Sequence, residues 1–398
     1  MRMTIKSQGV AFGYGFAIFI IWYLSGFDWT PRTNRRLDAA RGAIKIEDPF
    51  AETNLEPNIK YILQWTRPTK EPFTFMKAGQ DLFIERRCPV NNCYVTWNRT
   101  FLSNLTDYNA VLFYCHDVSR GFIRIPKKRS GHQKYVFVSP EPAAYYPVYH
   151  ERYNGFFNMT WTYRLDSEVF YGYILVRDRE GKKIGPKEIM HWPKTSEMLR
   201  INHKLKEKLN RKRIAAAWLV SNCHSLGGRE GIALKIKNEL KSKYNMTLEI
   251  FGACGHMLPD MFWQMLERDY YFYFSFENSI SEDYVSEKLL NALQHYMVPI
   301  VYGGANYTRF MPDGMYLNAR SLTVEELVKQ MVNIINDKEK YYDFFRWHNH
   351  YTYHYAGDTP DTDYYCEFCR KINDDKFMSR VTIKNDFAKW WNGWNIGE

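Results

Sequence analysis

The chain has 398 residues, a formal net charge of +10 at pH 7 and a pI of about 9.0. Its length exceeds one typical hydrophobic core, which predicts two domains. Aromatic residues make up 17% of the chain at a mean hydropathy of −0.49, a combination that excludes a disordered protein. The basic residues are scattered and form no nucleic-acid module, so we expect no nucleic acid. A polyanionic small ligand such as a nucleotide and a merely solvated basic surface both fit the charge.

The N-terminal region predicts a membrane anchor. Residues 10–27 carry no charge and come close to the roughly 17–25 residues that a spanning helix needs. No small-x-small cleavage site follows them, which favours an uncleaved signal anchor over a signal peptide. Residues 1–9 would then be a cytoplasmic stub, and the polar residues 28–57 a stem. Arginines after the apolar run oppose the positive-inside rule. The prediction that the rest of the chain is lumenal therefore depends on the short N-terminal stub and on the cysteines.

Asn-x-Thr sequons agree with a lumenal domain and are candidate N-glycosylation sites. They begin at Asn98, Asn104, Asn158, Asn245 and Asn306. The chain is rich in Asn and Thr, so we expect some of these matches to arise by chance.

Seven cysteines leave one over if the others pair. Four of them lie in two close pairs: Cys88 and Cys93, Cys366 and Cys369. These four fit either disulfides or a zinc site, and a lumenal address favours disulfides. Cys223 and Cys254 follow two consecutive predicted strands, which would bring them within bridging distance. Cys115 ends an apolar run, and we expect it to be buried and free.

The body of the chain indicates two consecutive sets of strands. The apolar, strand-like runs of the first set are residues 61–65, 110–115 and 135–139. A charged stretch with a basic helix at residues 204–212 follows, and we place the domain boundary around residues 195–212. The second set alternates strands and one long helix: 214–220, helix 231–244, 247–251, Tyr270–Phe276 and Val298–Tyr302. This alternation is typical of a doubly wound parallel sheet.

Polar residues gather after the strand Tyr270–Phe276. Ser281 is a candidate N-cap for a helix whose apolar residues recur from Val285 to Tyr296. In open α/β sheets, ligands bind at the carboxyl ends of the strands. The side chains at that edge are Glu277, Asn278, Tyr284, Glu287 and Lys288.

Each candidate catalytic or phosphate-binding residue has an ordinary alternative. Glu141 lies between two prolines after the strand at 135–139. It is either a general base in the site or an ordinary glutamate of a turn. Arg229, near Ser221 and Asn222, either grips phosphate oxygens at a helix start or lies on the surface. Lys288 either faces a diphosphate or is a surface lysine.

A second possible ligand set is a late DxD pair. Asp361 and Asp363 have the form with which metal-dependent glycosyltransferases hold Mn²⁺ or Mg²⁺. They follow Pro360 in a polar loop and not a strand, which counts against a metal role. No HExxH, GxSxG, P-loop or GxGxxG pattern occurs, which weakens hydrolase, NTPase and dehydrogenase interpretations.

Taken together, these segments resemble the α1,3-fucosyltransferases, a family of inverting, GDP-fucose-dependent type II Golgi enzymes. The segments that carry the resemblance are residues 138–142 (VSPEP), 158–167 (NMTWTYRLDS), 219–223 (LVSNC) with 229–231 (REG), and 272–303. The likeness covers roughly residues 60–370. It implies an α/β fold of the GT-B type, in which two Rossmann-like domains face a cleft, behind the transmembrane signal anchor and stem.

The resemblance also implies a domain plan. Residues 58–200 would be the acceptor-binding domain, residues 201–355 the GDP-fucose-binding domain, and residues 356–398 a tail tied to the first domain by disulfides. Cys88 and Cys93 would bridge to Cys366 and Cys369, and Cys223 to Cys254. The chain would be a single-pass type II Golgi membrane protein with a lumenal catalytic domain.

The resemblance finally implies an activity. The enzyme would transfer L-fucose from GDP-β-L-fucose to O3 of a GlcNAc residue on glycoprotein glycans, with inversion. Glu141 would be the general base, and Arg229 and Lys288 would neutralise the diphosphate, so that no metal or other cofactor is needed. The residues that would hold nucleotide and sugar are Ser221, Asn222, Asn278, Tyr284 and Glu287.

The acceptor stays open between the core GlcNAc of an N-glycan and an N-acetyllactosamine antenna. A metal-dependent transferase using Asp361 and Asp363 and a non-catalytic, membrane-anchored glycan-binding ectodomain are the alternatives.

Overall fold

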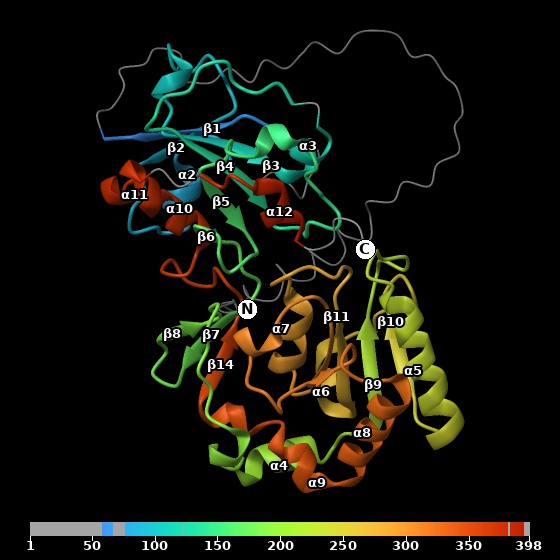
Figure 1. The fold of residues 1–398 in the computed structure, drawn as a ribbon. Helices are drawn as coiled ribbons and strands as arrows, with labels where there is room; N and C mark the ends of the chain where they lie inside the picture. The colour runs from blue at the N-terminus through green and yellow to red at the C-terminus, as the bar shows by residue number, and fades with distance from the viewer. Residues whose placement is uncertain (1–57, 67–75, 122, 381–382, 394–398) are drawn as a thin grey trace, which may run out of the picture. The chain divides into compact units, whose positions relative to one another are not determined.

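The computed structural model describes residues 58–66, 76–121, 123–380 and 383–393 (Figure 1). The predicted stub, anchor and stem, residues 1–57, lie outside the described residues. Within the described ranges, no helix combines the length and the apolar character needed to span a bilayer.

The first half is built on a parallel sheet with the strand order β2-β1-β3-β4-β5-β6. Its strands are β1 (Lys60–Gln64), β2 (Cys93–Thr96), β3 (Ala110–Tyr114), β4 (Lys134–Ser139), β5 (Met159–Thr162) and β6 (Val169–Phe170). Short helices α2 (Asp81–Glu85) and α3 (Cys115–Ser119) accompany them. Both faces of the central strands are buried, which explains why β3 and residues 135–138 of β4 are continuous apolar runs. Cys115 is free and buried beside this sheet, as expected.

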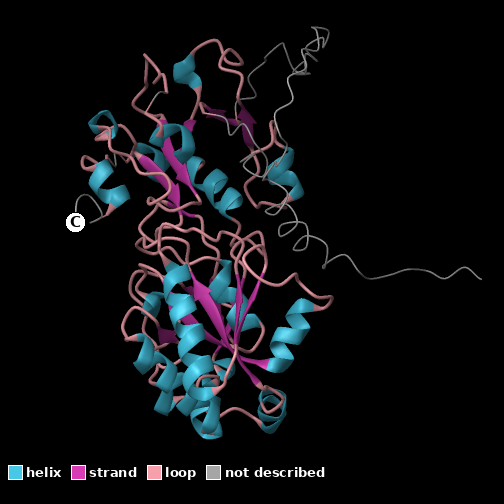
Figure 2. Ribbon diagram, turned by 90° about the vertical axis from the view of Figure 1, so that its right-hand side faces the viewer, coloured by secondary structure: helices cyan, strands magenta, loops and turns pink. Residues whose placement is uncertain are grey.

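The second half is a parallel sheet with the order β10-β9-β11-β12-β13. Its strands are β9 (Ile214–Leu219), β10 (Leu248–Phe251), β11 (Tyr270–Phe276), β12 (Val298–Tyr302) and β13 (Leu317–Asn318). Its helices are α4 (His203–Leu209), α5 (Arg229–Tyr244), α6 (Phe262–Asp269), α7 (Glu287–Gln294), α8 (Val324–Asn336) and α9 (Lys338–Asp343). The predicted α/β class with parallel sheets is therefore confirmed. Figure 2 shows the loops of both halves gathered between the two sheets.

A third, antiparallel sheet was not predicted. It has the order β14-β7-β8 and pairs β7 (Leu175–Asp178) and β8 (Lys183–Gly185) with β14 (Tyr351–His354). Ile174 and Val176 accordingly pack in one apolar cluster with Leu289 and Leu293 of α7. The domain limit at residue 200 stays a prediction, but residues 175–185 associate with the second half of the chain.

The C-terminal tail returns to the first sheet (Figure 1). It contains α10 (Tyr364–Ile372), α11 (Asp375–Ser379) and α12 (Phe387–Asn392). Phe368 of α10 stacks on Trp161 of β5 at 4.5 Å, and Trp391 of α12 meets Phe137 of β4 at 4.7 Å. This apolar contact holds the last part of the chain on the sheet formed by the first part.

Two disulfides reinforce the same contact, because they join Cys88 to Cys366 and Cys93 to Cys369. A third joins Cys223 to Cys254 within the second half, and all three agree with the pairing that the resemblance implied. The alternative of a four-cysteine zinc site is therefore wrong, because all four sulfurs are engaged in covalent bonds.

One predicted glycosylation site conflicts with the fold. Asn158 is 7% exposed, its side-chain oxygen accepts from the Tyr135 amide at 2.6 Å, and its side-chain nitrogen donates to the Gln133 carbonyl at 3.0 Å. A glycan there is incompatible with this packing, so the prediction at Asn158 is wrong. The other sequon asparagines, Asn98, Asn104, Asn245 and Asn306, are exposed, and their occupancy stays a prediction.

Candidate active site

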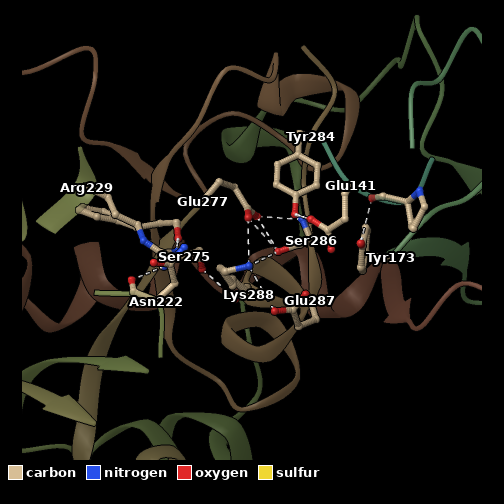
Figure 3. Close-up of polar contacts among 12 residues, drawn as sticks. Glu141, Tyr173, Asn222, Arg229, Ser275, Glu277, Tyr284, Ser286, Glu287 and Lys288 are labelled. Atoms are coloured by element: carbon tan, nitrogen blue, oxygen red, sulfur yellow. Dashed lines mark hydrogen bonds and ion pairs between the residues drawn. The ribbon is translucent and has the colours of Figure 1, made fainter. Parts of the chain in front are cut away.

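A cluster of two carboxylates and one lysine lies where β11 ends and α7 begins (Figure 3). The Lys288 ammonium lies 3.1 Å from Glu277 and 3.2 Å from Glu287, and it donates to the Ser286 hydroxyl at 2.6 Å. Glu277 is 1% exposed at its side chain, Lys288 16% and Glu287 41%. The cluster is therefore closed on the Glu277 side and open on the Glu287 side.

The charges of this cluster stabilise one another. Burial works to lower the pKa of Lys288, but Glu277 and Glu287 outweigh it and hold that pKa above its usual value. Burial likewise works to raise the pKa of Glu287, and Lys288 reverses this and leaves it low. Both groups are charged at neutral pH, so the site offers a fixed cation flanked by carboxylates.

Glu277 also decides where the helix begins. Its carboxylate accepts from the Ser286 amide at 2.8 Å and from the Ser286 hydroxyl at 2.9 Å. The helix consequently starts at Glu287, with Ser286 as N-cap residue, and the predicted cap at Ser281 is wrong. Asp283, in between, has a left-handed φ of +57° and accepts from the Leu165 amide at 3.2 Å. The loop therefore turns toward the first half before the helix starts, which places Tyr284 outside α7.

Glu141 follows β4 and faces this cluster from the first half. Tyr284 donates from its hydroxyl to the Glu141 carboxylate at 3.5 Å. The backbone around Glu141 is held by the Ser139 hydroxyl, which donates to the Glu141 carbonyl at 2.6 Å, and by Tyr173, which donates to the Pro140 carbonyl at 3.0 Å. The structure thus brings together Glu141, Tyr284, Glu287 and Lys288, as the sequence predicted.

Burial raises the pKa of Glu141 to about 7. Lys288 acts in the opposite direction, Glu287 and Glu277 add to the rise, and the Tyr284 hydroxyl lowers the pKa slightly. A carboxylate with a pKa near the working pH is strong enough to accept a proton and is still ionised in about half of the molecules. The arrangement suits general-base chemistry.

Arg229 lies beside the Lys288 cluster, next to Asn222 (Figure 3). It is the first residue of α5 and is 3% exposed. It donates to the carbonyls of Phe276 at 2.7 Å and Asn222 at 3.1 Å, and to the Glu230 carboxylate at 3.4 Å. These bonds use three of its five N–H donors. Arg229 therefore binds together the carboxyl ends of β9 and β11, and a direct bond to phosphate stays a prediction.

The remaining predicted donor-binding residues line the same edge. Asn222 donates from its side chain to the Tyr145 hydroxyl of the first half at 3.0 Å. The Asn278 carbonyl accepts from the Gly227 amide at 2.9 Å, and a Cβ at Gly227 would come within 3.2 Å of that oxygen, so glycine is the residue that permits this approach without a shift of the loop. Ser221 is partly buried beside the Cys223–Cys254 disulfide.

The DxD pair serves the tail. Asp363 caps α10 by accepting from the Tyr365 amide at 2.8 Å, and it forms a close ion pair with Arg86. Asp361 lies 3.7 Å from Arg177 and is 66% exposed, against 4% for Asp363. In the described ranges, no three His, Cys, Asp or Glu side chains are grouped so that they could hold a metal ion.

Three residues contribute to the site without a role that the sequence predicts. The sequence places Glu277 at the strand end but indicates no function for it, and no pattern points to Tyr145 or Tyr173. The apolar run before Glu277 indicates that this residue ends a buried strand. No sequence pattern indicates that the Glu277 carboxylate binds Ser286 and Lys288. The two tyrosines meet the site through contacts between distant segments, which carry no local signal.

Comparisons with known proteins agree with this geometry. Residues 209–390 match the family model described as "Glycosyltransferase family 10 (fucosyltransferase) C-term", and residues 57–174 match "Fucosyltransferase, N-terminal". Drosophila melanogaster Alpha-(1,3)-fucosyltransferase C is 33% identical over 320 residues, which are 78% of this chain and 72% of that protein. The chain belongs to the fucosyltransferases of glycosyltransferase family 10. As a member of this family it is a glycosyltransferase.

Two further similarities complete the comparison. Drosophila melanogaster Glycoprotein 3-alpha-L-fucosyltransferase A is 27% identical over 80% of this family 10 chain and 58% of that protein. The solved structure "Crystal Structure of alpha1,3-Fucosyltransferase with GDP-fucose" aligns with a TM-score of 0.47 at 15% identity, covering 84% of this chain and 95% of that one.

Proposed function

We propose that this family 10 enzyme transfers L-fucose from GDP-β-L-fucose to O3 of a GlcNAc residue on a glycoprotein glycan, with inversion. The observation that carries the proposal is the meeting of Glu141, with a pKa of about 7, and the Lys288 cluster of the other half. The names of the two Drosophila relatives support α1,3 transfer of fucose. The arrangement of two α/β halves supports the GT-B type, with acceptor and donor bound to residues 58–200 and 201–355.

The reaction needs a base on the acceptor side and a cation on the donor side. Glu141 accepts the proton of the acceptor hydroxyl while that oxygen forms a bond to C1 of fucose. The bond from C1 to the diphosphate oxygen breaks on the opposite face, so the configuration inverts and GDP leaves with the electron pair. Lys288 stabilises the negative charge that grows on the leaving group, an effect that is strongest in a site with little water.

The other site residues bind and position the donor. Arg229 fixes the strand ends around the diphosphate and keeps two N–H donors beyond the three used in the structure. Glu287, 41% exposed, is open to a pair of ribose hydroxyls. Ser221, Asn222 and Asn278 lie along the edge that the nucleotide would follow.

A substitution at Glu141 tests the function. We expect Glu141→Gln to abolish transfer from GDP-fucose to every member of a panel of defined glycans, because the amide has no proton-accepting charge. GDP affinity should stay within about twofold, since catalysis and ground-state binding are separable. Glu151→Gln, on an exposed residue of the same half, is the matched control. Substantial transfer by Glu141→Gln would place the base elsewhere, and a wild-type protein that neither binds GDP nor transfers fucose would contradict the function.

Two further parts of the proposal have their own tests. No divalent metal is needed, because Lys288 supplies the positive charge, so activity should persist in EDTA; a loss that Mn²⁺ restores would contradict this. The protein is a single-pass type II Golgi membrane protein anchored by residues 10–27. Carbonate extraction and protease protection of the full chain in Golgi vesicles would check this topology, and a body accessible from the cytosol would refute it.

A further inference from the structure

A basic cavity lies on the first half, away from the Lys288 cluster. It has a volume of about 580 Å³ and is lined by basic and apolar side chains. The basic ones are Arg99, Arg124, Lys127 and Arg152. Among the residues that the structure describes, no carboxylate lies within ion-pair distance of any of these four cations. A concentration of cations without carboxylates attracts an anion.

The cavity is organised by a tryptophan. Trp65 donates from its indole nitrogen to the Arg124 carbonyl at 2.6 Å, and the Arg99 guanidinium stacks on its ring at 3.7 Å. Arg99 also donates to the Trp65 carbonyl at 2.9 Å. Ile123 and Ile125 complete the apolar wall. One aromatic ring therefore holds two arginine-bearing segments in place, so the cations do not rest on flexible chain alone.

The cavity and Glu141 share one edge of the sheet. Trp65 follows β1 and Glu141 follows β4, and the order β1-β3-β4 puts one strand between them. All three strands are parallel, so their carboxyl ends point the same way. Two strand spacings are about 10 Å. A glycan whose hydroxyl reaches Glu141 can therefore place a neighbouring sugar in the cavity.

We infer that this cavity binds an anionic sugar of the acceptor, so that the enzyme prefers glycans with a carboxylate or a sulfate ester near the attacked GlcNAc. The inference rests on the proposed function and names the acceptor class for it. The apolar wall suits a sugar ring, and the four cations suit its acid group. The donor diphosphate is bound by Lys288 of α7 in the other half, so these four cations remain available to the acceptor.

Matched acceptors test this preference. The substrates are the best neutral glycan of the panel, the same glycan with one added glucuronic acid, and the same glycan with one added sulfate ester. A fourth substrate presents the neutral glycan on a peptide with acidic residues. The value of kcat/KM is measured for wild type, for the double variant Arg124→Ala/Lys127→Ala, and for Lys128→Ala. Lys128 is an exposed lysine in the same segment outside the cavity lining. Because Asn98 adjoins Arg99, all proteins are compared after enzymatic removal of N-glycans.

We expect wild type to favour an acidic glycan roughly fivefold, mainly through KM, since two exposed ion pairs contribute about that factor together. The double variant should lose this preference and keep its turnover of the neutral glycan, and Lys128→Ala should behave like wild type. Raising the salt from about 0.15 M to about 1 M should remove the preference, because the Debye length falls from about 8 Å to about 3 Å.

Equal kcat/KM for acidic and neutral glycans, or a preference that survives in the double variant, would overturn the inference. A preference that follows only the acidic peptide would overturn it as well, in favour of a protein partner. In each of these cases the neutral glycan is still fucosylated, whereas failure of the proposed function would leave no acceptor fucosylated at all.

Discussion

Lowering the pH through 7 should switch off this fucosyltransferase by protonating Glu141. Its partly buried carboxyl has a pKa of about 7, against an ordinary value of 4.5. At pH 8 about 91% of this group is ionised, and at pH 6 about 9%, so the rate should fall about tenfold between these values. An ordinary carboxyl would lose only about 3% of its ionised form over the same interval.

The assay is kcat/KM for the acceptor, measured at saturating GDP-fucose from about pH 5.5 to about pH 8.5. GDP affinity is measured in parallel, so that a loss of donor binding is not mistaken for a loss of the base. A profile that is flat between pH 6 and pH 8 would refute the assignment of the base. So would a fall with the same midpoint in GDP affinity, since the titrating group would then act on the donor.

The raised pKa of Glu141 also predicts how the stability of the protein depends on pH. The folded-state pKa of Glu141 lies above its unfolded value, so the folded protein holds the proton more tightly. This contribution to stability is complete below about pH 4.5 and is lost as the pH rises through 7. The loss is at most about 3.5 kcal/mol, because the pKa rises from 4.5 to about 7 and each pH unit corresponds to about 1.4 kcal/mol. Glu141→Gln should therefore raise the free energy of unfolding at pH 8 and change it little at pH 4. If Glu141→Gln changed the free energy of unfolding equally at both pH values, burial would not raise the pKa of Glu141 in the folded protein.

Three other perturbations follow from the site and the tail. Lys288→Met should weaken donor binding and lower the free energy of unfolding by about 3–5 kcal/mol, because it leaves the Glu277 carboxylate buried without its cation. In a urea titration, the double variant Glu277→Gln/Lys288→Met should be less destabilised than Lys288→Met alone. Tyr284→Phe should move the midpoint of the pH–rate profile upward, since the lost hydroxyl favours the ionised base; an unchanged or lower midpoint would contradict the contact. Cys88→Ser/Cys366→Ser should lower the stability by about 2–5 kcal/mol, since this bond spans 278 residues, and a urea midpoint equal to that of wild type would show that packing of the tail suffices.

Strand positions were predictable because parallel strands leave a plain signal. β11 and β12 are found at the predicted residues, and β4 differs by one residue at its start. Buried on both faces, such strands are short apolar runs between polar segments. Because ligands meet the carboxyl ends of such strands, the strand positions also indicated the candidate site.

The start of α7 was not predictable, for a physical reason. Ser281 with Glu282 and Asp283 has the local chemistry of a helix start, yet the N-cap residue is Ser286, five residues later. Glu277 overrides the local preference, because its buried carboxylate is satisfied by the Ser286 amide and hydroxyl. A tertiary requirement of one buried charge thus outweighs the capping preference of a serine.

Contacts between distant segments were also beyond the sequence. β14 pairs with β7, although no local pattern in residues 351–354 marks that partner. For the tail, the cysteines at 366 and 369 indicated a link to the first sheet, but no pattern indicated which aromatic side chains would pack there. Asn158 is a case in which a local motif predicts the wrong environment for a side chain. Its sequon indicates an exposed loop, whereas the side chain serves as a buried link between β4 and β5. Only the packed structure distinguishes the two cases.

The strength of the base depends on both halves of the protein. Burial of Glu141 is the largest cause of its raised pKa, and Glu277 and Glu287 of the second half add to it. Tyr284, also of the second half, contributes the contact that closes the carboxylate off. If the halves moved apart, more water would reach Glu141, and the carboxylates of Glu277 and Glu287 would lie farther from it. The pKa of Glu141 would then fall toward the ordinary value. Glu141 is therefore a strong base only when the donor-side loop lies against it. The proton of the acceptor is then taken only where Lys288 is in place to meet the leaving group, which couples the two ends of the reaction.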